Sequence, residues 1–140
     1  WSEAPMGTKF KFASLKHTTR AIEKCWRIYQ GDVSRLLDVC RQCIVFDNLE
    51  DLCRCVLLIE RSKDVVVERV KNRMSPKWDS KSQGGYRDVL FNLRVVNEEA
   101  MRERVYHHVC ELQLILWEFA SLKTDMGHTR YRVSRNMRGE

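Results

Sequence analysis

The chain has 140 residues, 44% hydrophobic and 31% charged, which fits one domain with a modest core and excludes a second independent core. No apolar run approaches the roughly 18 residues of a membrane span, and residues 1–12 lack the apolar centre of a secretory signal, so we expect a soluble protein with no membrane partner. The net charge of +6 favours an anionic partner: a nucleotide, a nucleic acid or an acidic protein surface. The start at Trp1 instead of Met leaves room for other domains or subunits of a larger assembly as partners.

The first half of the chain predicts a helix, a strand and a second helix. After an N-terminal extension over residues 1–15, apolar side chains recur at helical spacing over residues 16–29, at Ile22, Cys25, Trp26 and Tyr29. Residues 42–46 are apolar and β-favouring, which predicts a strand. Asn48 then stands where an N-cap would begin a helix over residues 49–62.

The second half predicts three strands and a closing helical region. The strands are expected over residues 64–73, 86–96 and 105–114, with a polar loop at 74–85 and a charged turn at 97–104. The remaining residues read as helical pieces interrupted by Gly127. We therefore predict an α/β fold of the α+β type over residues 16–140: one domain with a mixed, largely antiparallel sheet of four to five strands and helices packed on one face.

Alternation along the predicted strands separates an apolar face from a polar one. Successive side chains in a strand point to opposite faces. Val66 and Val70 are assigned to the apolar side of their strand, with an interruption at Glu68. The polar face then collects Arg69, Lys71, Arg73, Tyr86, Asp88, Asn92, Arg94, His107, Glu111 and Gln113. Such a face suits polyphosphate and a metal ion, but an ordinary solvated face has the same pattern.

Six cysteines raise the question of a metal or disulfide site. Cys40 and Cys43 are separated by an odd number of residues near the start of a strand, so their side chains point to opposite faces. Cys53 and Cys55 lie about 200° apart around a helix. Neither pair is placed to hold one ion, and we expect buried, reduced cysteines in the cytoplasm or another reducing compartment.

Several segments, in order and over residues 16–131, resemble the synthetase domain of RelA/SpoT-type enzymes, which transfer pyrophosphate from ATP to the ribose 3′-hydroxyl of GDP or GTP. The segment LKHTTRAIEKCWR followed by LLDVCRQCIVF resembles the family's basic helix and metal-binding turn. RVKNRM resembles its basic strand, GGYRDVLFNL its Gly-Tyr strand, and CELQLIL its Glu-x-Gln strand. Gly127, His128 and Tyr131 fit the family's closing helix. The resemblance implies a nucleotidyltransferase-like fold.

The resemblance also implies roles for individual residues. Asp38 and Glu111 would be the catalytic pair that binds Mg²⁺, and Tyr86 would stack on a guanine base. The other implied nucleotide contacts are Lys71, Arg73, Arg69, Arg20, Lys24, Asn92, Gln113 and His128. Three positions that are polar in the family are apolar here or nearly so: Cys43, Leu90 and Ile115. An isoleucine cannot donate to phosphate, so phosphate contacts are lost at that position.

Two main hypotheses and one weaker one follow. The first is a divergent RelA/SpoT-like domain that binds purine nucleotides with Mg²⁺ and transfers pyrophosphate from ATP to GDP or GTP. The second is a catalytically inactive module that serves in protein or RNA assembly, as the apolar replacements indicate. RNA binding through the basic face is the weaker reading, because the aromatic residues do not alternate with basic ones as a base-stacking platform requires.

Overall fold

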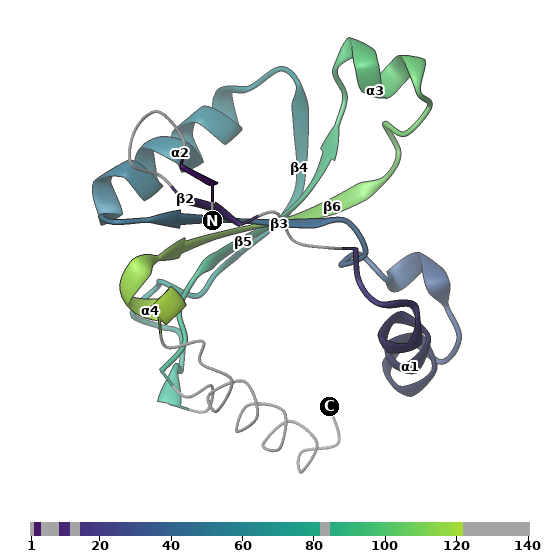
Figure 1. Cartoon of the computed structure of the whole chain (residues 1–140), viewed down its shortest axis with the longest axis horizontal. Coiled ribbons are helices and arrows are strands. Elements are labelled where there is room, and N and C mark those ends of the chain that lie inside the picture. Colours follow the sequence, from purple (N-terminus) through teal and green to yellow (C-terminus); the bar gives the residue numbers. More distant parts are fainter. Residues whose placement is uncertain (1, 4–8, 12–14, 82–84, 122–140) are drawn as a thin grey trace.

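The structure, a computed structural model, describes residues 2–3, 9–11, 15–81 and 85–121 (Figure 1). In chain order its elements are β1 Ser2–Glu3, β2 Lys9–Lys11, α1 Thr18–Tyr29, the 3₁₀ helix Val33–Arg35, β3 Arg41–Phe46, α2 Leu49–Arg61, β4 Val65–Asn72, β5 Val89–Val95, α3 Glu98–Arg102, β6 Val109–Leu116 and α4 Trp117–Ser121. The predicted helical region around Gly127 and His128 lies outside the described residues.

The sheet has six strands in the order β1-β2-β3-β6-β5-β4. Among these described strands, β3 and β6 run parallel, and the other neighbouring pairs are antiparallel. The predicted class, a mixed and largely antiparallel sheet with helices, is confirmed. The strand number exceeds the predicted four to five because two short strands form within residues 1–15, which were assigned to an extension.

The hydrophobic core lies between α2 and one face of the sheet. The alternation in β5 and β6 is as predicted: Phe91 and Leu93 of β5 and Leu114 of β6 are buried together with Leu52 of α2. Asn48 caps α2 as expected, since its side chain accepts a bond from the backbone nitrogen of Asp51. Figure 1 shows α2 along one side of the sheet, while α1 and α4 lie on the other side near opposite ends of the strands. Helix α2 therefore covers the core face, and it does not cover the second face of the sheet.

The valines of β4 correct one prediction. The register shifts between Val67 and Arg69, which places a bulge at Glu68. Val66 pairs with Arg94 of the polar face, whereas Val70 pairs with Phe91 of the core face. The assignment of both valines to one side was wrong, because the extra residue of a bulge switches the faces on either side of it.

Two segments between strands also differ from the sequence prediction. The charged turn at 97–104 contains α3, which begins where the Asn97 side chain accepts a bond from the Ala100 nitrogen and has Glu98 and Glu99 in its first turn. The last predicted strand begins later, at Val109 and not at residue 105. Cap chemistry outweighs the absence of an apolar stripe in this short helix.

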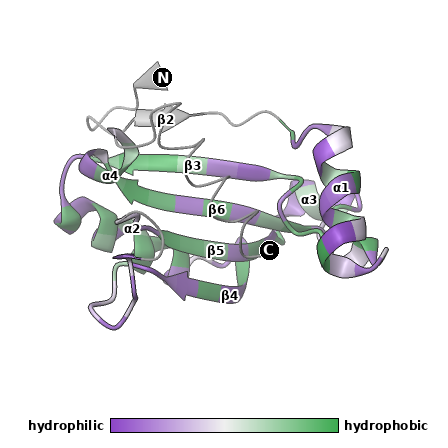
Figure 2. Cartoon of the chain, turned by 90° about the horizontal axis from the view of Figure 1, so that it is seen from below, coloured by the Kyte–Doolittle hydropathy of each residue, from purple (hydrophilic) through white to green (hydrophobic). Residues whose placement is uncertain are grey.

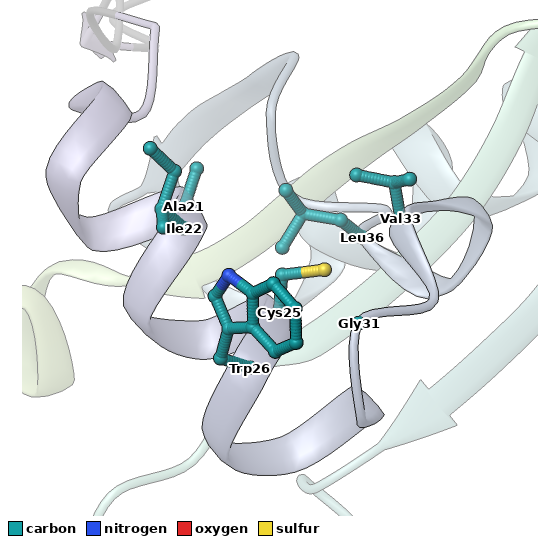
Figure 3. A pocket seen from close by; sticks show the side chains of 7 residues that line it. All are labelled: Ala21, Ile22, Cys25, Trp26, Gly31, Val33 and Leu36. Carbon is teal, nitrogen blue, oxygen red and sulfur yellow. The ribbon is translucent and has the colours of Figure 1, made fainter.

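The apolar side of α1 is more exposed than its spacing predicts. Cys25 is buried, but Trp26 is 70% and Ile22 53% exposed. Together with Gly31, Val33 and neighbouring residues they line an apolar hollow of about 260 Å³ between α1 and the 3₁₀ helix (Figure 3). Helix α1 therefore uses its basic side, described below, to approach the sheet.

Among the described residues there is no helix with the length and apolarity that a membrane crossing requires.

Candidate functional site

Strand register aligns a row of polar residues across four strands of the second face. Glu111 of β6 stands opposite Arg41 of β3 on one side and Asn92 of β5 on the other, and Asn92 stands opposite Arg69 of β4. The next row along the same face contains Cys43, Gln113, Leu90 and Lys71. Figure 2 shows these hydrophilic stretches of β3 and β6 side by side. The predicted convergence of β4, β5 and β6 residues on one face is present in the structure.

Asp38 lies in the turn that leads into β3 and is held by two lysines. Lys16 donates to Asp38 Oδ2, and Lys24 of α1 donates to the same oxygen at 3.0 Å. Burial alone would raise the pKa of Asp38, but the two lysine bonds outweigh it and hold this pKa below its usual value. The other oxygen, Oδ1, is buried and has no hydrogen-bond partner among the described residues. Within the described part of the chain, Asp38 therefore uses one acceptor oxygen and leaves the other without a donor.

Glu111 shares this environment. Burial raises the pKa of Glu111, and the negative charge of Asp38 raises it further. Three cations partly offset the rise: Lys24, Arg41 and Arg73. The two carboxylates come from segments far apart in the sequence, and Glu111 lies within the electrostatic field of Asp38. The structure thus brings Asp38 and Glu111 into one site.

A second acidic centre lies further along the same face. Asp88 is fully buried and forms a bidentate pair with Arg73, with Nη2 to Oδ2 at 2.7 Å. The Tyr86 hydroxyl donates to Asp88 at 3.0 Å, and the Gln113 amide reaches both Asp88 and, at 2.7 Å, the Tyr86 oxygen. Burial and the nearby Asp88 charge raise the pKa of Tyr86 above its usual value. Asp88 is the hub of a closed hydrogen-bond network.

Arg69 and Lys71 extend the positive charge toward β4. Burial lowers the pKa of Lys71, and the charges of Arg73 and Arg69 lower it further. The acids Asp88 and Glu111 act in the opposite direction. The Lys71 ammonium also lies 5.5 Å from the ring centroid of Trp78, in the loop after β4. Lys71 therefore lies within the field of both acidic centres.

Other predicted site residues lie apart from this cluster. Arg20 is exposed on α1 and pairs with Glu23 at 3.3 Å. Arg94 pairs with Glu68 at 2.6 Å, and the His107 ring packs on Tyr106 with centroids 4.1 Å apart. His128 is outside the described residues.

Sequence reasoning missed two members of the site and the role of a third. Lys16 has the spacing of an ordinary helix-surface residue, and Arg41 was not singled out although it lies at the start of β3, two residues before Cys43 on the same face. The central place of Asp88 was also missed. Alternation indicated that Asp88 belongs to the polar face, but nothing in the sequence showed that it would be buried.

One end of this face is apolar. Val45 and Ile115, opposite each other on β3 and β6, are 2% and 0% exposed. Helix α4 follows β6 at this end of the strands. The polar side chains of this face therefore lie at its end near α1 and on the part that β4 and β5 form.

The donors at Asp38 and Glu111 fit Mg²⁺, which prefers oxygen ligands and is bound through one or two carboxylates. The observation that favours this fit is the buried Asp38 Oδ1, to which no residue of the described ranges donates a hydrogen bond. A cation at this position would also remove the repulsion through which Asp38 raises the pKa of Glu111.

The structure is similar to those of two small alarmone synthetases and a GTP pyrophosphokinase family protein. Small alarmone synthetase 1 from Bacillus subtilis, solved with its product pppGpp, matches with a TM-score of 0.66 and 15% identity, over 91% of this chain and 62% of that one. Small alarmone synthetase 2 from the same organism gives 0.64 and 17% identity over 92% and 64%. A GTP pyrophosphokinase family protein from Streptococcus pneumoniae gives 0.59 and 11% identity over 93% and 68%.

The chain thus spans less than two thirds of the length of either small alarmone synthetase. Neither the protein-family models nor the curated protein sequences give a match. At these identities the likeness concerns the fold, and it agrees with the resemblance read from the sequence: the chain has the RelA/SpoT-like fold of the small alarmone synthetases.

Proposed function

We propose that this domain binds purine nucleotides with Mg²⁺ and transfers pyrophosphate from ATP to the 3′-hydroxyl of GDP or GTP. The observation that carries the proposal is the pairing of Asp38 and Glu111 within a basic cluster, on a fold shared with alarmone synthetases. Phosphoryl-type transfer needs no covalent nucleophile, and it depends on positioning and on neutralisation of phosphate charge.

Asp38 and Glu111 are the proposed Mg²⁺ ligands and catalytic pair. When bound, the ion would neutralise charge on the transferred group and lower the pKa of a coordinated hydroxyl. Burial raises the pKa of Glu111, and Glu111 is proposed to accept the proton of the acceptor hydroxyl. Lys24 and Lys16 hold Asp38 in place from the other side.

The phosphates are proposed to lie along the cations of β4, Lys71 and Arg69, with Lys24 and Arg20 of α1 on the opposite flank. Arg73 is bound to the buried Asp88, so its proposed role includes holding Tyr86, whose ring centroid lies 5.7 Å from the Arg73 guanidinium. Tyr86 would stack on the acceptor base, and Gln113 fixes its hydroxyl. Asn92 and His128 remain proposed nucleotide contacts.

Arg41 is a proposed replacement for a missing cation. The family resemblance implies an arginine where Cys43 stands, and Cys43 shares its face with Arg41, two residues earlier on β3. Arg41 is opposite Glu111 and lowers its pKa. We propose that Arg41 supplies the phosphate contact from a position two residues before Cys43, closer to the two acids.

The test is incubation with ATP, Mg²⁺ and either GDP or GTP, followed by chromatography of the nucleotides. We expect a new product with a pyrophosphate on the acceptor, and a loss of about 100-fold or more in rate for Glu111→Gln. Glu118→Gln, at an exposed position on α4, is the matched control and keeps full activity. Failure of the folded wild-type domain to form product with either acceptor would contradict the transferase proposal.

A second candidate is a catalytically inactive module that binds a protein or RNA partner. The burial of Val45 and Ile115 on the nominally polar face favours it, because these side chains fill one end of that face with groups that cannot contact phosphate. It predicts no Mg²⁺-dependent nucleotide binding in calorimetry and a partner that co-purifies stably. Mg²⁺-dependent binding of ATP would exclude this candidate.

A further inference from the structure

Two cysteines and a histidine meet at the end of the sheet where β3 and β6 begin. The ligand atoms of Cys40, His108 and Cys110 all lie within 4.8 Å of one another. They come from the starts of two strands that are far apart in the sequence. This cluster is separate from the acidic site, because Cys110 packs with the core on the face covered by α2, whereas Glu111 points to the other face.

The strand ladder fixes the two thiols side by side. Arg41 stands opposite Glu111 in the parallel pairing, so one step back sets Cys40 beside Cys110. The Glu111 nitrogen donates to the Cys40 carbonyl oxygen at 2.9 Å, which ties the start of β3 to the start of β6. The sulfur positions are therefore set by backbone pairing and not by two flexible loops.

His108 is held by the turn that precedes β6. Its backbone nitrogen donates to the Val105 oxygen at 2.9 Å, and the Val105 nitrogen donates to the Ala100 oxygen of α3 at 3.0 Å. His108 and Cys110 are two residues apart where β6 begins, so they share a face. His108 is exposed while the cysteines are half-buried, which leaves the cluster open to solvent on one side.

We propose that Cys40, His108 and Cys110 form a binding site for one Zn²⁺ ion, with solvent as the fourth ligand. Two thiolates and an imidazole are ligands that zinc prefers in tetrahedral sites, whereas Mg²⁺ prefers oxygen. Two thiolates also neutralise the ion, so the half-buried position carries no net charge. Without metal, burial and Cys40 raise the pKa of Cys110 to about 11, so the metal must displace a proton there.

The site has a consequence for the acidic centre. Cys110 directly precedes Glu111, and Cys40 follows Asp38 by two residues. A bound ion would join the two segments that carry the acids, through bonds that do not involve the acids themselves. Zinc therefore acts here as a clamp on the backbone.

Cobalt(II) is the first probe, because it takes zinc's place in thiolate sites and gives thiolate charge-transfer absorption. We expect the reduced wild-type domain to bind one equivalent of Co²⁺ with tetrahedral visible bands, and Zn²⁺ to remove these bands by displacement. Cys40→Ser, Cys110→Ser and His108→Ala should each weaken binding by more than about 100-fold. Cys53→Ser, an exposed cysteine of α2, is the matched control and keeps the bands.

Alkylation of the wild-type domain keeps the test independent of whether the variants fold. Zn²⁺ should protect Cys40 and Cys110, but not Cys53, from iodoacetamide, as read by peptide mass spectrometry. Equal labelling with and without Zn²⁺ would overturn the proposal, as would tight Co²⁺ binding that persists in Cys110→Ser. Unchanged binding in His108→Ala would overturn the three-ligand assignment.

Discussion

Two acidic centres on one face of the sheet have opposite characters. Asp88 is fully buried, and its oxygens are engaged by Arg73, Tyr86 and Gln113. Asp38 and Glu111 are partly buried and repel each other, and one Asp38 oxygen has no partner among the described residues. A buried network whose members are all bonded rigidifies its surroundings. Asp38 and Glu111, by contrast, contribute little to stability as a pair, but their carboxylate oxygens are suitable ligands for a cation.

The difference separates scaffold from site. The Asp88 network supports Tyr86 and Gln113, and Arg87 reinforces it by donating to the carbonyl oxygens of Arg73 and Ser75 at 3.2 and 2.9 Å. These bonds hold the loop after β4 against the sheet. Asp38 and Glu111 are not part of a comparable network of hydrogen bonds among the described residues, and the pKa values of both are shifted. Groups with shifted pKa values are often found at functional sites. Substitutions should therefore affect stability most at the Asp88 centre and function most at the Asp38 and Glu111 centre.

The largest expected effect on stability is that of Asp88→Ala. It leaves the Arg73 charge and the Tyr86 and Gln113 polar groups without their shared acceptor, so we expect a loss of about 3–5 kcal/mol of unfolding free energy. Urea denaturation measures it. Asp47→Ala, at an exposed position after β3, is the control with an effect below about 0.5 kcal/mol. A loss at Asp88 as small as this control would contradict the scaffold role.

Asp38→Asn should cost less, about 1–2 kcal/mol at neutral pH, because the two lysines lose a charged acceptor but keep a neutral amide oxygen in its place. The pKa of Asp38 is lowered in the folded state, so its stabilisation is present above the unfolded pKa and is lost as pH falls through the folded pKa. Urea midpoints of wild type and Asp38→Asn should therefore converge in acid. Asp64→Asn, also exposed, serves as control. A difference that stays constant down to acid pH would refute the ion-pair account.

Tyr86→Phe tests the edge of the Asp88 network. Removal of the hydroxyl deletes the bonds to Asp88 and Gln113 and should cost about 1 kcal/mol. The aromatic ring stays, so nucleotide affinity measured by calorimetry should change little if the ring stacks on the base. Tyr106→Phe, outside the network, is the control. A complete loss of nucleotide binding in Tyr86→Phe would show that the hydroxyl, and not the ring, makes the contact.

Glu111→Gln should have the smallest effect on stability and in the opposite direction. The pKa of Glu111 is raised in the folded state, so its ionised form costs stability at neutral pH. This cost decreases as pH falls through the raised pKa and is gone below the unfolded pKa. We expect a gain of up to about 1 kcal/mol at neutral pH that vanishes in acid. Thermal denaturation over a pH series measures it. A destabilised variant at neutral pH would mean that Glu111 is a structural partner, like Asp88.

The fold was predictable because the strands alternate cleanly. Phe91 and Leu93 against Asn92 and Arg94 define two faces without knowledge of the partner strands. The bulge at Glu68 was visible only as an interruption, so the faces of Val66 and Val70 could not be assigned correctly. The short strands β1 and β2 have no apolar pattern of their own: β2 depends on pairing with β3, and β1 on pairing with β2.

The site was predictable where a residue type and its face were enough. Resemblance and alternation pointed to Asp38 and Glu111, which the structure brings together. The burial of Asp88 depends on the loop after β4, whose position no local pattern reveals. The meeting of Cys40 with Cys110 depends on the parallel register of β3 and β6. The sequence analysis considered Cys40 only together with Cys43, whereas in the structure Cys40 lies next to Cys110 and His108.

The central claim is that Asp38 and Glu111 bind one divalent cation together. Manganese, a hard cation with Mg²⁺-like oxygen preference, can be titrated in the presence of ATP by electron paramagnetic resonance, using wild type, Asp38→Asn, Glu111→Gln and the double variant. The account predicts that each single substitution weakens Mn²⁺ binding nearly as much as both together, because the two groups act as a unit. Additive losses, or Mn²⁺ binding that neither substitution changes, would contradict it.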